Sequence, residues 1–152
     1  MPCREYNSYG VQFMRILAVD PGSKNLGIAL SDPSGTIDNP LQVLKHISRA
    51  VNASAILDLA NQHAAEMILI GQSLDENGQP TFEGRRAARL AAEIQSQTNL
   101  QILLWDESFS TLAARDAQIA LGTPRRKRKG HLDDLAATVI LQSYLDAQAD
   151  QR

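Results

Sequence analysis

Short apolar segments and turns alternate at the start of the chain. Residues 15–20 form an apolar run that ends in an acid, and Pro21-Gly22 after it is typical of a turn. Apolar positions resume at residues 25–30. A third segment, 36–44, contains Pro40, which places it at a sheet edge or at an irregularity. Three closely spaced strands joined by turns predict an antiparallel meander.

The remainder of the chain alternates between helical periodicity and short apolar runs. Helical spacing of apolar residues predicts helices, whereas the short runs predict buried strands. The expected helices cover residues 50–65, 82–97, 111–121 and 132–148, and the expected strands cover residues 67–70 and 100–105. Strands that alternate with helices imply parallel pairing and right-handed crossovers. The sequence therefore predicts an α/β fold with a mixed five-stranded sheet, a three-strand antiparallel meander plus two parallel strands, and helices on both faces.

Composition narrows the class of protein. The chain has 152 residues, of which 43% are hydrophobic and 5% aromatic, so one core of Leu, Ile, Val and Ala is expected. A single cysteine excludes an internal disulfide and fits a reducing compartment. No apolar run reaches the length of a membrane span, and residues 1–13 are too polar for a signal peptide. We expect a cytoplasmic protein with an N-terminal extension at 1–13, one domain at 14–148 and a tail at 149–152.

Three acids stand at the ends of predicted elements. Asp20 ends the first strand, Glu107 follows the last strand, and Asp133 lies at the start of the last helix. Sites in open α/β sheets form where strand ends and helix starts converge. Carboxylates favour Mg²⁺ or Mn²⁺, and three of them can hold two ions about 4 Å apart. Taken singly, each acid also has an ordinary interpretation, as a turn residue, a solvated loop charge or a helix cap.

One basic run interrupts a chain whose net charge is −2. It immediately precedes Asp133 and consists of Arg125, Arg126, Lys127, Arg128 and Lys129. A solvated loop is the usual interpretation of such a run. Beside a candidate metal site, it also fits contact with the phosphate backbone of a nucleic acid. Lys24 of the first hairpin belongs to the same expected interface, and Arg85, Arg86 and Arg89 could add to it.

Four motifs follow one another along most of the chain, from residue 14 to residue 144. They are Asp20-Pro-Gly-Ser-Lys-Asn-Leu-Gly-Ile-Ala, Ile70-Gly71 with Leu74-Asp-Glu-Asn-Gly78, Asp106-Glu107 with Ser110-Thr111, and Lys129-Gly-His-Leu-Asp133 with Ala136-Ala137 and Ile140-Leu141. Together they resemble the YqgF/RuvX family, described as Holliday junction resolvases and as nucleases that mature the 5′ end of pre-16S ribosomal RNA. The resemblance implies a ribonuclease H-like fold, a divalent metal, and a catalytic triad on Asp20, Glu107 and Asp133.

Three stretches depart from the family pattern. Asp20-Pro21-Gly22 resembles the first motif of the bacterial RuvC resolvases more than the Asp-Xaa-Gly usual in this family. The family's Gly-Leu-Pro-Leu is here Gly71-Gln72-Ser73-Leu74. The Arg that often follows the second acid is Ser108, so one potential phosphate contact is missing. All three acids of the triad are present, and the departures therefore bear on the substrate more than on the chemistry.

Several functions are compatible with these patterns. The preferred one is a metal-dependent nuclease acting on structured nucleic acid, with pre-rRNA favoured over a four-way DNA junction through the family resemblance. A kinase or ATPase of the actin-like fold shares the first hairpin, but that fold uses two such domains. A non-catalytic RNA- or ribosome-binding module is the third alternative. A monomer and a homodimer are both compatible with the sequence, and cutting both strands of a junction would favour the dimer.

Overall fold

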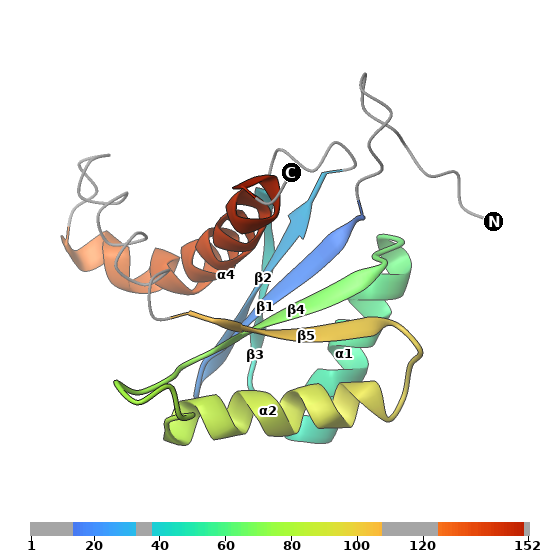
Figure 1. Ribbon diagram of the computed structural model, residues 1–152, viewed down its shortest axis with the longest axis horizontal. Coiled ribbons are helices and arrows are strands. Elements are labelled where there is room, and N and C mark those ends of the chain that lie inside the picture. The colour runs from blue at the N-terminus through green and yellow to red at the C-terminus, as the bar shows by residue number, and fades with distance from the viewer. Residues whose placement is uncertain (1–13, 33–37, 108–124, 151–152) are drawn as a thin grey trace.

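A five-stranded sheet forms the centre of the computed structural model, which describes residues 14–32, 38–107 and 125–150, with backbone alone at 38–39, 125–134 and 149–150. The strands lie in the order β3-β2-β1-β4-β5 (Figure 1). The elements are β1 (Ile16–Pro21), β2 (Asn25–Ser31), β3 (Asp38–Lys45), α1 (Arg49–Gln62), β4 (Met67–Gln72), α2 (Phe82–Gln95), β5 (Gln101–Asp106) and α4 (Arg125–Asp150).

The pairing of the strands confirms the predicted mixed sheet. β1, β2 and β3 form an antiparallel meander, and β4 and β5 add to β1 in parallel. Pro40 lies on the edge strand β3, opposite a shift of register between Ile28 and Ala29. Both features are expected of a proline in a strand, because proline cannot donate to the ladder.

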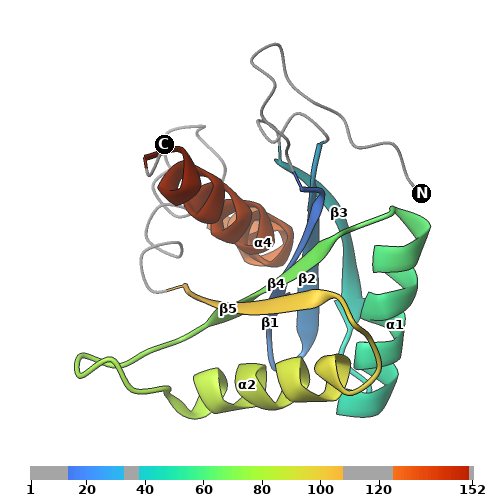
Figure 2. The same cartoon turned by 45° about the vertical axis from the view of Figure 1, so that its right-hand side comes forward.

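Alternate residues of each strand face opposite layers of helices. Leu17 and Val19 of β1 belong to the core beneath α1 and α2, whereas Ile16 and Ala18 belong to the core beneath α4. Figure 2 shows α4 on one side of the sheet and the other two helices on the other side. This confirms the prediction of helices on both faces, and the strict alternation fixes which face every later strand residue occupies.

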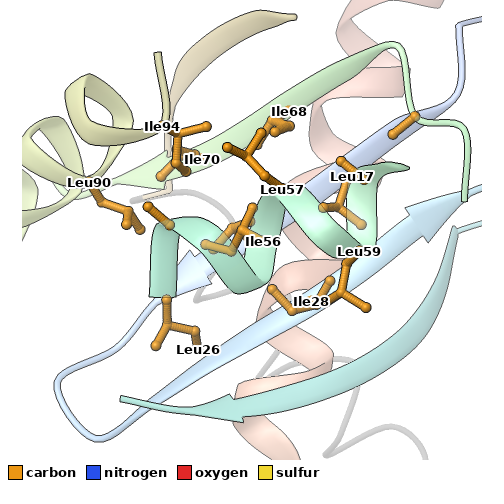
Figure 3. Close-up of a cluster of buried hydrophobic side chains, with 14 of the residues drawn as sticks. Leu17, Leu26, Ile28, Ile56, Leu57, Leu59, Ile68, Ile70, Leu90 and Ile94 are labelled. Carbon is orange, nitrogen blue, oxygen red and sulfur yellow. The ribbon is translucent and has the colours of Figure 1, made fainter. Parts of the chain in front are cut away.

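The α1/α2 face carries the larger apolar cluster. Ile56 of α1 and Ile94 of α2 are fully buried against the strands (Figure 3). The expected buried face of α2 is confirmed, but Val51 of α1, expected to be buried, is 47% exposed. Asn52 is buried in its place. Its side chain accepts a hydrogen bond from Ile47 N–H and donates one to the Lys45 carbonyl, which satisfies the backbone between β3 and α1.

The last helix differs from its prediction in both start and register. It begins at Arg125 rather than at residue 132, so the basic run lies in its first turns and not in a loop. The face that packs on the sheet contains Ala137, Ile140 and Leu141, whereas Leu132, Leu135, Ala136, Val139, Ile140 and Ser143 were expected. Apolar residues occur all around this helix, so periodicity alone could not single out one face.

Some expectations lie outside the described residues, namely the helix at 111–121 and the extension at 1–13. The last helix continues to Asp150, beyond the expected end of the domain at residue 148. Within the described part of the chain, no helix is long and apolar enough to cross a membrane.

Candidate acidic metal site

Asp20 lies near the end of β1, on the face covered by α4. The alternation along β1 determines this placement, because Ile16 and Ala18 face the same helix. Across the hairpin, Asp20 pairs with Gly27 of β2, a residue without a side chain. Gly22 closes the turn after Asp20, and its N–H donates to the Asn25 carbonyl at 3.0 Å.

The role expected of Gly22 needs a correction. An unusual backbone angle was expected there, but Gly78 is the only glycine with a positive φ among the described residues. Gly22 is required for a different reason. A Cβ at this position would collide with the carbonyl oxygen of Asn25, so only glycine allows the tight hairpin.

Glu107 follows β5 directly and continues its pairing with β4. Its N–H donates to the Gln72 carbonyl at 3.0 Å, which fixes the backbone that carries the carboxylate. The carboxylate lies over Gly71 of β4. A Cβ on Gly71 would approach Glu107 Oε2 to 2.6 Å and would also collide with Ile140 of α4. Gly71 therefore makes the space in which the carboxylate fits beneath the helix.

Asp20 and Glu107 meet at this end of the sheet. The pKa of Glu107 is raised to about 8, chiefly by burial, then by the negative charge of Asp20 and by a hydrogen bond with Asp20. The charges of Asp106 and Glu83 act in the same way, with smaller effects. Two carboxylates so placed share a proton near neutral pH, because both cannot be ionised without a compensating cation.

The chemistry of this pair fits a divalent cation. A cation with hard, oxygen-seeking character would replace the shared proton and neutralise both carboxylates. The charged groups that act on Glu107 are all carboxylates, and the described residues contain no cysteine, so this donor set does not favour zinc. Asp20 and Glu107 are thus the two described residues that could hold Mg²⁺ or Mn²⁺.

The third predicted acid, Asp133, lies within α4, whose side chains are described only from residue 135 onward. It is in the third turn of the helix rather than at its start, since α4 begins at Arg125. The helix dipole therefore does not act on Asp133 as expected for a residue in the first turn. Among the described residues, no group of three or more His, Cys, Asp or Glu side chains comes together.

Two contacts fix the direction of α4 relative to the strands. Trp105 Nε1 donates to Ser143 Oγ at 3.1 Å, and two residues later along β5 Glu107 lies beside Ile140. Following β5 toward its end therefore leads toward earlier residues of α4. Asp133 is seven residues before Ile140, two helical turns farther in this direction. Its backbone is placed beyond the strand ends on the side of the two acids.

The expected basic interface is described only in part. Lys24 is exposed in the β1–β2 turn, where its carbonyl accepts from His46 N–H at 2.8 Å. The backbone of residues 125–129 forms the first turns of α4, and their side chains lie outside the description. Helix α2, which carries Arg85, Arg86 and Arg89, lies on the opposite face of the sheet from α4 (Figure 2). These arginines therefore do not extend the expected basic interface at the start of α4.

Sequence reasoning missed the residues that shape the site without touching a substrate. Gly71 ends an apolar run, and a glycine in a strand could have indicated a close approach. Trp105, in which no functional signal was seen, joins the end of β5 to α4 through Ser143 and packs edge-to-face on Tyr144 at 5.2 Å. The departure at Gln72 ties β4 to α2, since its Nε2 donates to the Gly84 carbonyl at 3.1 Å.

A mixed sheet of this order, with carboxylates at the ends of β1 and β5 beneath a helix, defines the ribonuclease H-like class. RuvC of T. thermophilus, solved in complex with a Holliday junction substrate, superimposes with a TM-score of 0.58 over 90% of this chain and 97% of RuvC, at 14% identity. The Holliday junction resolvase of fowlpox virus, solved with its substrate DNA, superimposes with a TM-score of 0.53 over 89% of this chain and 99% of the resolvase chain, at 12% identity. At these identities the likeness shows the fold alone.

Comparison of the sequence with known proteins shows the family to which this chain belongs. The model of the RuvX family, described as Holliday junction resolvase, matches residues 14–147, and the chain belongs to this family. A protein of Desulforamulus reducens named "Putative pre-16S rRNA nuclease" is 35% identical over 90% of this chain and 99% of its own length. A protein of Thermoanaerobacter pseudethanolicus with the same name is 35% identical over 91% of this chain and 100% of its own length.

Proposed function

We propose that this protein is a metal-dependent nuclease that hydrolyses phosphodiester bonds in structured nucleic acid in the cytoplasm. The observation that carries the proposal is the half-buried, hydrogen-bonded pair of Asp20 and Glu107 at one end of a resolvase-like sheet. Asp133 is the third ligand in this proposal. Its support is the family motif at residues 129–133 and the course of α4 past the strand ends.

The residues of the chain prepare the site rather than react in it. Asp20 and Glu107 would hold the cation, which would take the place of their shared proton. Gly71 leaves room for the Glu107 carboxylate, and Ile140 covers it from the side of α4. When bound, one or two Mg²⁺ or Mn²⁺ ions would activate water and stabilise the leaving oxygen.

The 5′ end of pre-16S rRNA is the favoured substrate. Relatives at 35% identity over nearly the whole chain carry that name, whereas the two resolvase structures compared above share only 12% and 14% of residues with it. Resolution of four-way DNA junctions is the second candidate, because the family model itself is described as Holliday junction resolvase. A resolvase must cut two strands, so the second candidate would favour a homodimer, whereas trimming one RNA strand suits a monomer.

One experiment tests the activity and separates the two substrates. Labelled pre-16S rRNA and a labelled four-way DNA junction are incubated side by side with Mg²⁺, Mn²⁺ or excess chelator. We expect cleavage of the RNA with either metal and none in chelator. Asp20→Asn should abolish cleavage without unfolding, and Asp58→Asn, an exposed acid of α1, should leave it unchanged. Full activity in chelator, or full activity of Asp20→Asn, would contradict the proposal.

The basic run is proposed to bind the phosphate backbone of the substrate. It comprises Arg125, Arg126, Lys127, Arg128 and Lys129 and begins the helix that carries Asp133. Replacing all five with Gln should weaken binding of the inactive Asp20→Asn protein to RNA. The slope of log affinity against log salt should fall by roughly 0.7 for each phosphate of a single strand that the variant no longer neutralises. An unchanged slope would show that the run touches no phosphates.

A further inference from the structure

A second site lies at the same end of the sheet, on the face away from α4. It is a pocket of about 160 Å³ between the β1–β2 turn, the start of α1 and the middle of α2. Pro21, Gly22 and Leu26 form one wall and Leu90 of α2 forms another. Leu26 and Leu90 belong to the core beneath α1 and α2, which places the pocket across the sheet from Asp20 and Glu107.

Three basic side chains from three separate segments line this pocket. His46 follows β3, Arg49 begins α1, and Arg86 comes from the middle of α2. Asn52 is the remaining polar residue of the lining, and its buried amide is already bonded to the backbone at Lys45 and Ile47. None of the described lining residues is acidic, although acids outnumber Lys and Arg by 17 to 15 in the whole chain.

This selection of charges points to an anionic ligand. Arg49 and Arg86 both line this hollow, and the planar donors of a guanidinium group match the oxygens of a phosphate group. The nearby acid Glu83 offsets only one of the two arginines, since its Oε2 accepts from Arg86 Nη1 at 3.3 Å on the exposed side of α2. The first turn of α1 adds the positive end of a helix of 14 residues.

The pocket and the acidic pair are joined by short connections. Pro21 and Gly22 of the pocket directly follow Asp20 in sequence. Glu83, the partner of Arg86, is close enough to Glu107 for its charge to contribute to the raised pKa of Glu107. The pocket and the acidic pair therefore lie at the same end of the sheet, on either side of the β1–β2 turn.

We propose that the pocket lined by His46, Arg49 and Arg86 binds a phosphate group. If the proposed function holds, the phosphate belongs to the nucleic acid substrate at some distance from the cut, and the pocket sets where the strand lies. The same chemistry would accept a free phosphate or the phosphate of a mononucleotide, and the experiment below distinguishes these sources.

The test measures binding in chelator, so that it does not depend on cleavage. A short fluorescein-labelled single-stranded RNA is titrated with the wild type, Arg49→Gln, Arg86→Gln and Arg89→Gln. Arg89 is the matched control, because it is an arginine of α2 outside the pocket lining. We expect the two pocket variants to weaken RNA binding about 10-fold, the loss of one charge-assisted hydrogen bond, and the control to change it much less.

Thermal unfolding with inorganic phosphate or a nucleoside 5′-monophosphate, at ionic strength matched with chloride, identifies the source. Stabilisation that Arg86→Gln loses and Arg89→Gln keeps, with RNA affinity unchanged, assigns the pocket to a free phosphate. Loss of RNA affinity in the pocket variants assigns it to the substrate. If neither ligand distinguishes Arg49→Gln and Arg86→Gln from Arg89→Gln, the proposal is overturned.

Folding and activity are monitored separately. Each variant is compared without any anion, and Arg86→Lys, which keeps the charge, should retain part of the affinity. Arg49→Gln provides the test if Arg86→Gln does not fold, because Arg49 is exposed at the start of α1. If the protein binds phosphate as expected but cleaves no nucleic acid, the proposed function is disproved, whereas the proposal of a phosphate-binding pocket is not affected.

Discussion

The two faces of the sheet use the same strands for different purposes. On the α1/α2 face, large aliphatic residues such as Leu17, Ile28 and Ile68 fill the space between strands and helices. On the α4 face, Ala18 and Ala29 occupy the positions next to Leu17 and Ile28, and the cluster there is smaller. The first face contains the larger apolar cluster of the described residues, whereas Gly71 on the second leaves room for the Glu107 carboxylate beneath a helix.

The difference shows how a half-buried acidic pair is tolerated in so small a domain. Bringing Asp20 and Glu107 together destabilises the metal-free protein, as the raised pKa of Glu107 indicates. The continuous core on the other face offsets this cost without any contact with the acids. Changes to one face should therefore alter mainly stability, and changes to the other should alter mainly activity.

The largest effect is expected at the third acid. Position 133 is about 40° around α4 from Ala137, on the same side as Ile140, while position 134 is about 60° away on the other side. Ile140 marks the side that faces Glu107. Asp133→Asn should therefore lower cleavage more than about 100-fold, beyond the loss typical of residues that only support metal ligands. Asp134→Asn should keep most of the activity, and cleavage rates of the two purified variants decide between them.

The sequence alone predicts the same ranking of the two variants for a different reason. The apolar spacing of residues 132–143 would place Asp134 about 160° around the helix from Ala136, pointing to solvent. The observed face places it on a flank instead, so the contrast with Asp133 rests on which side of the helix faces Glu107. A larger loss in Asp134→Asn than in Asp133→Asn would mean that α4 approaches the acids from a different side.

A second test compares one substitution on each face. Gly71→Ala would push a methyl group against Glu107 Oε2 and Ile140, and overpacking of this kind costs about 1–3 kcal/mol. Ile56→Ala, in the core of the other face, should cost about 2–5 kcal/mol through the cavity that it leaves. Urea unfolding and cleavage rates are measured for both. We expect Gly71→Ala to lose more activity although it loses less stability, and the opposite ranking would contradict the division between the faces.

The sequence predicted the strands best where an apolar run was clearly bounded on both sides. Strands β1, β2, β4 and β5 were located to within two residues at each end, because apolar runs there are bounded by turns and polar residues. The two acids at the strand ends were singled out for the same reason, since each follows an apolar run whose end is clear in the sequence. Their hydrogen bond could not be predicted, because it depends on Gly71 and Ile140, which are distant in sequence from Asp20.

The last helix shows where this reasoning stops. Its apolar residues surround the axis, so several faces were compatible with the sequence, and the contact of Ile140 with Gly71 selected one of them. Its basic first turns looked like a loop because a run of like charges is usually solvated. The phosphate pocket was missed altogether, because His46, Arg49 and Arg86 come together only through the fold.

A smaller effect is expected from pH. The pKa of Glu107 is raised to about 8 in the folded protein from 4.5, so the folded state holds one more proton than the unfolded state between these values. Stability of the metal-free protein should therefore fall as pH rises from about 4.5 to about 8. Glu107→Gln should remove this part of the decline, whereas Glu76→Gln, an exposed loop acid, should keep it.

The same linkage predicts how metal acts on stability. Mg²⁺ competes with the shared proton, so it should raise the melting temperature more above pH 8 than near neutrality. The measurement is thermal unfolding in chelator and in Mg²⁺ across this range. Equal stabilisation at every pH, or an unaltered pH profile in Glu107→Gln, would show that the carboxyl pair is not where the metal binds.

The smallest effect on stability and activity is expected at the contact between β5 and α4. Ser143→Ala removes the acceptor of the Trp105 indole N–H, a half-buried hydrogen bond of 3.1 Å, and should cost about 0.5–1.5 kcal/mol. Ser96→Ala removes an exposed hydrogen bond of 2.7 Å at the end of α2, on the other face, and should cost less. Because Trp105 precedes Glu107 by two residues, loosening this joint should also slow cleavage several-fold at unchanged RNA affinity. A Ser143→Ala protein that is less stable but fully active would show that α4 can shift on the sheet without disturbing the carboxylates.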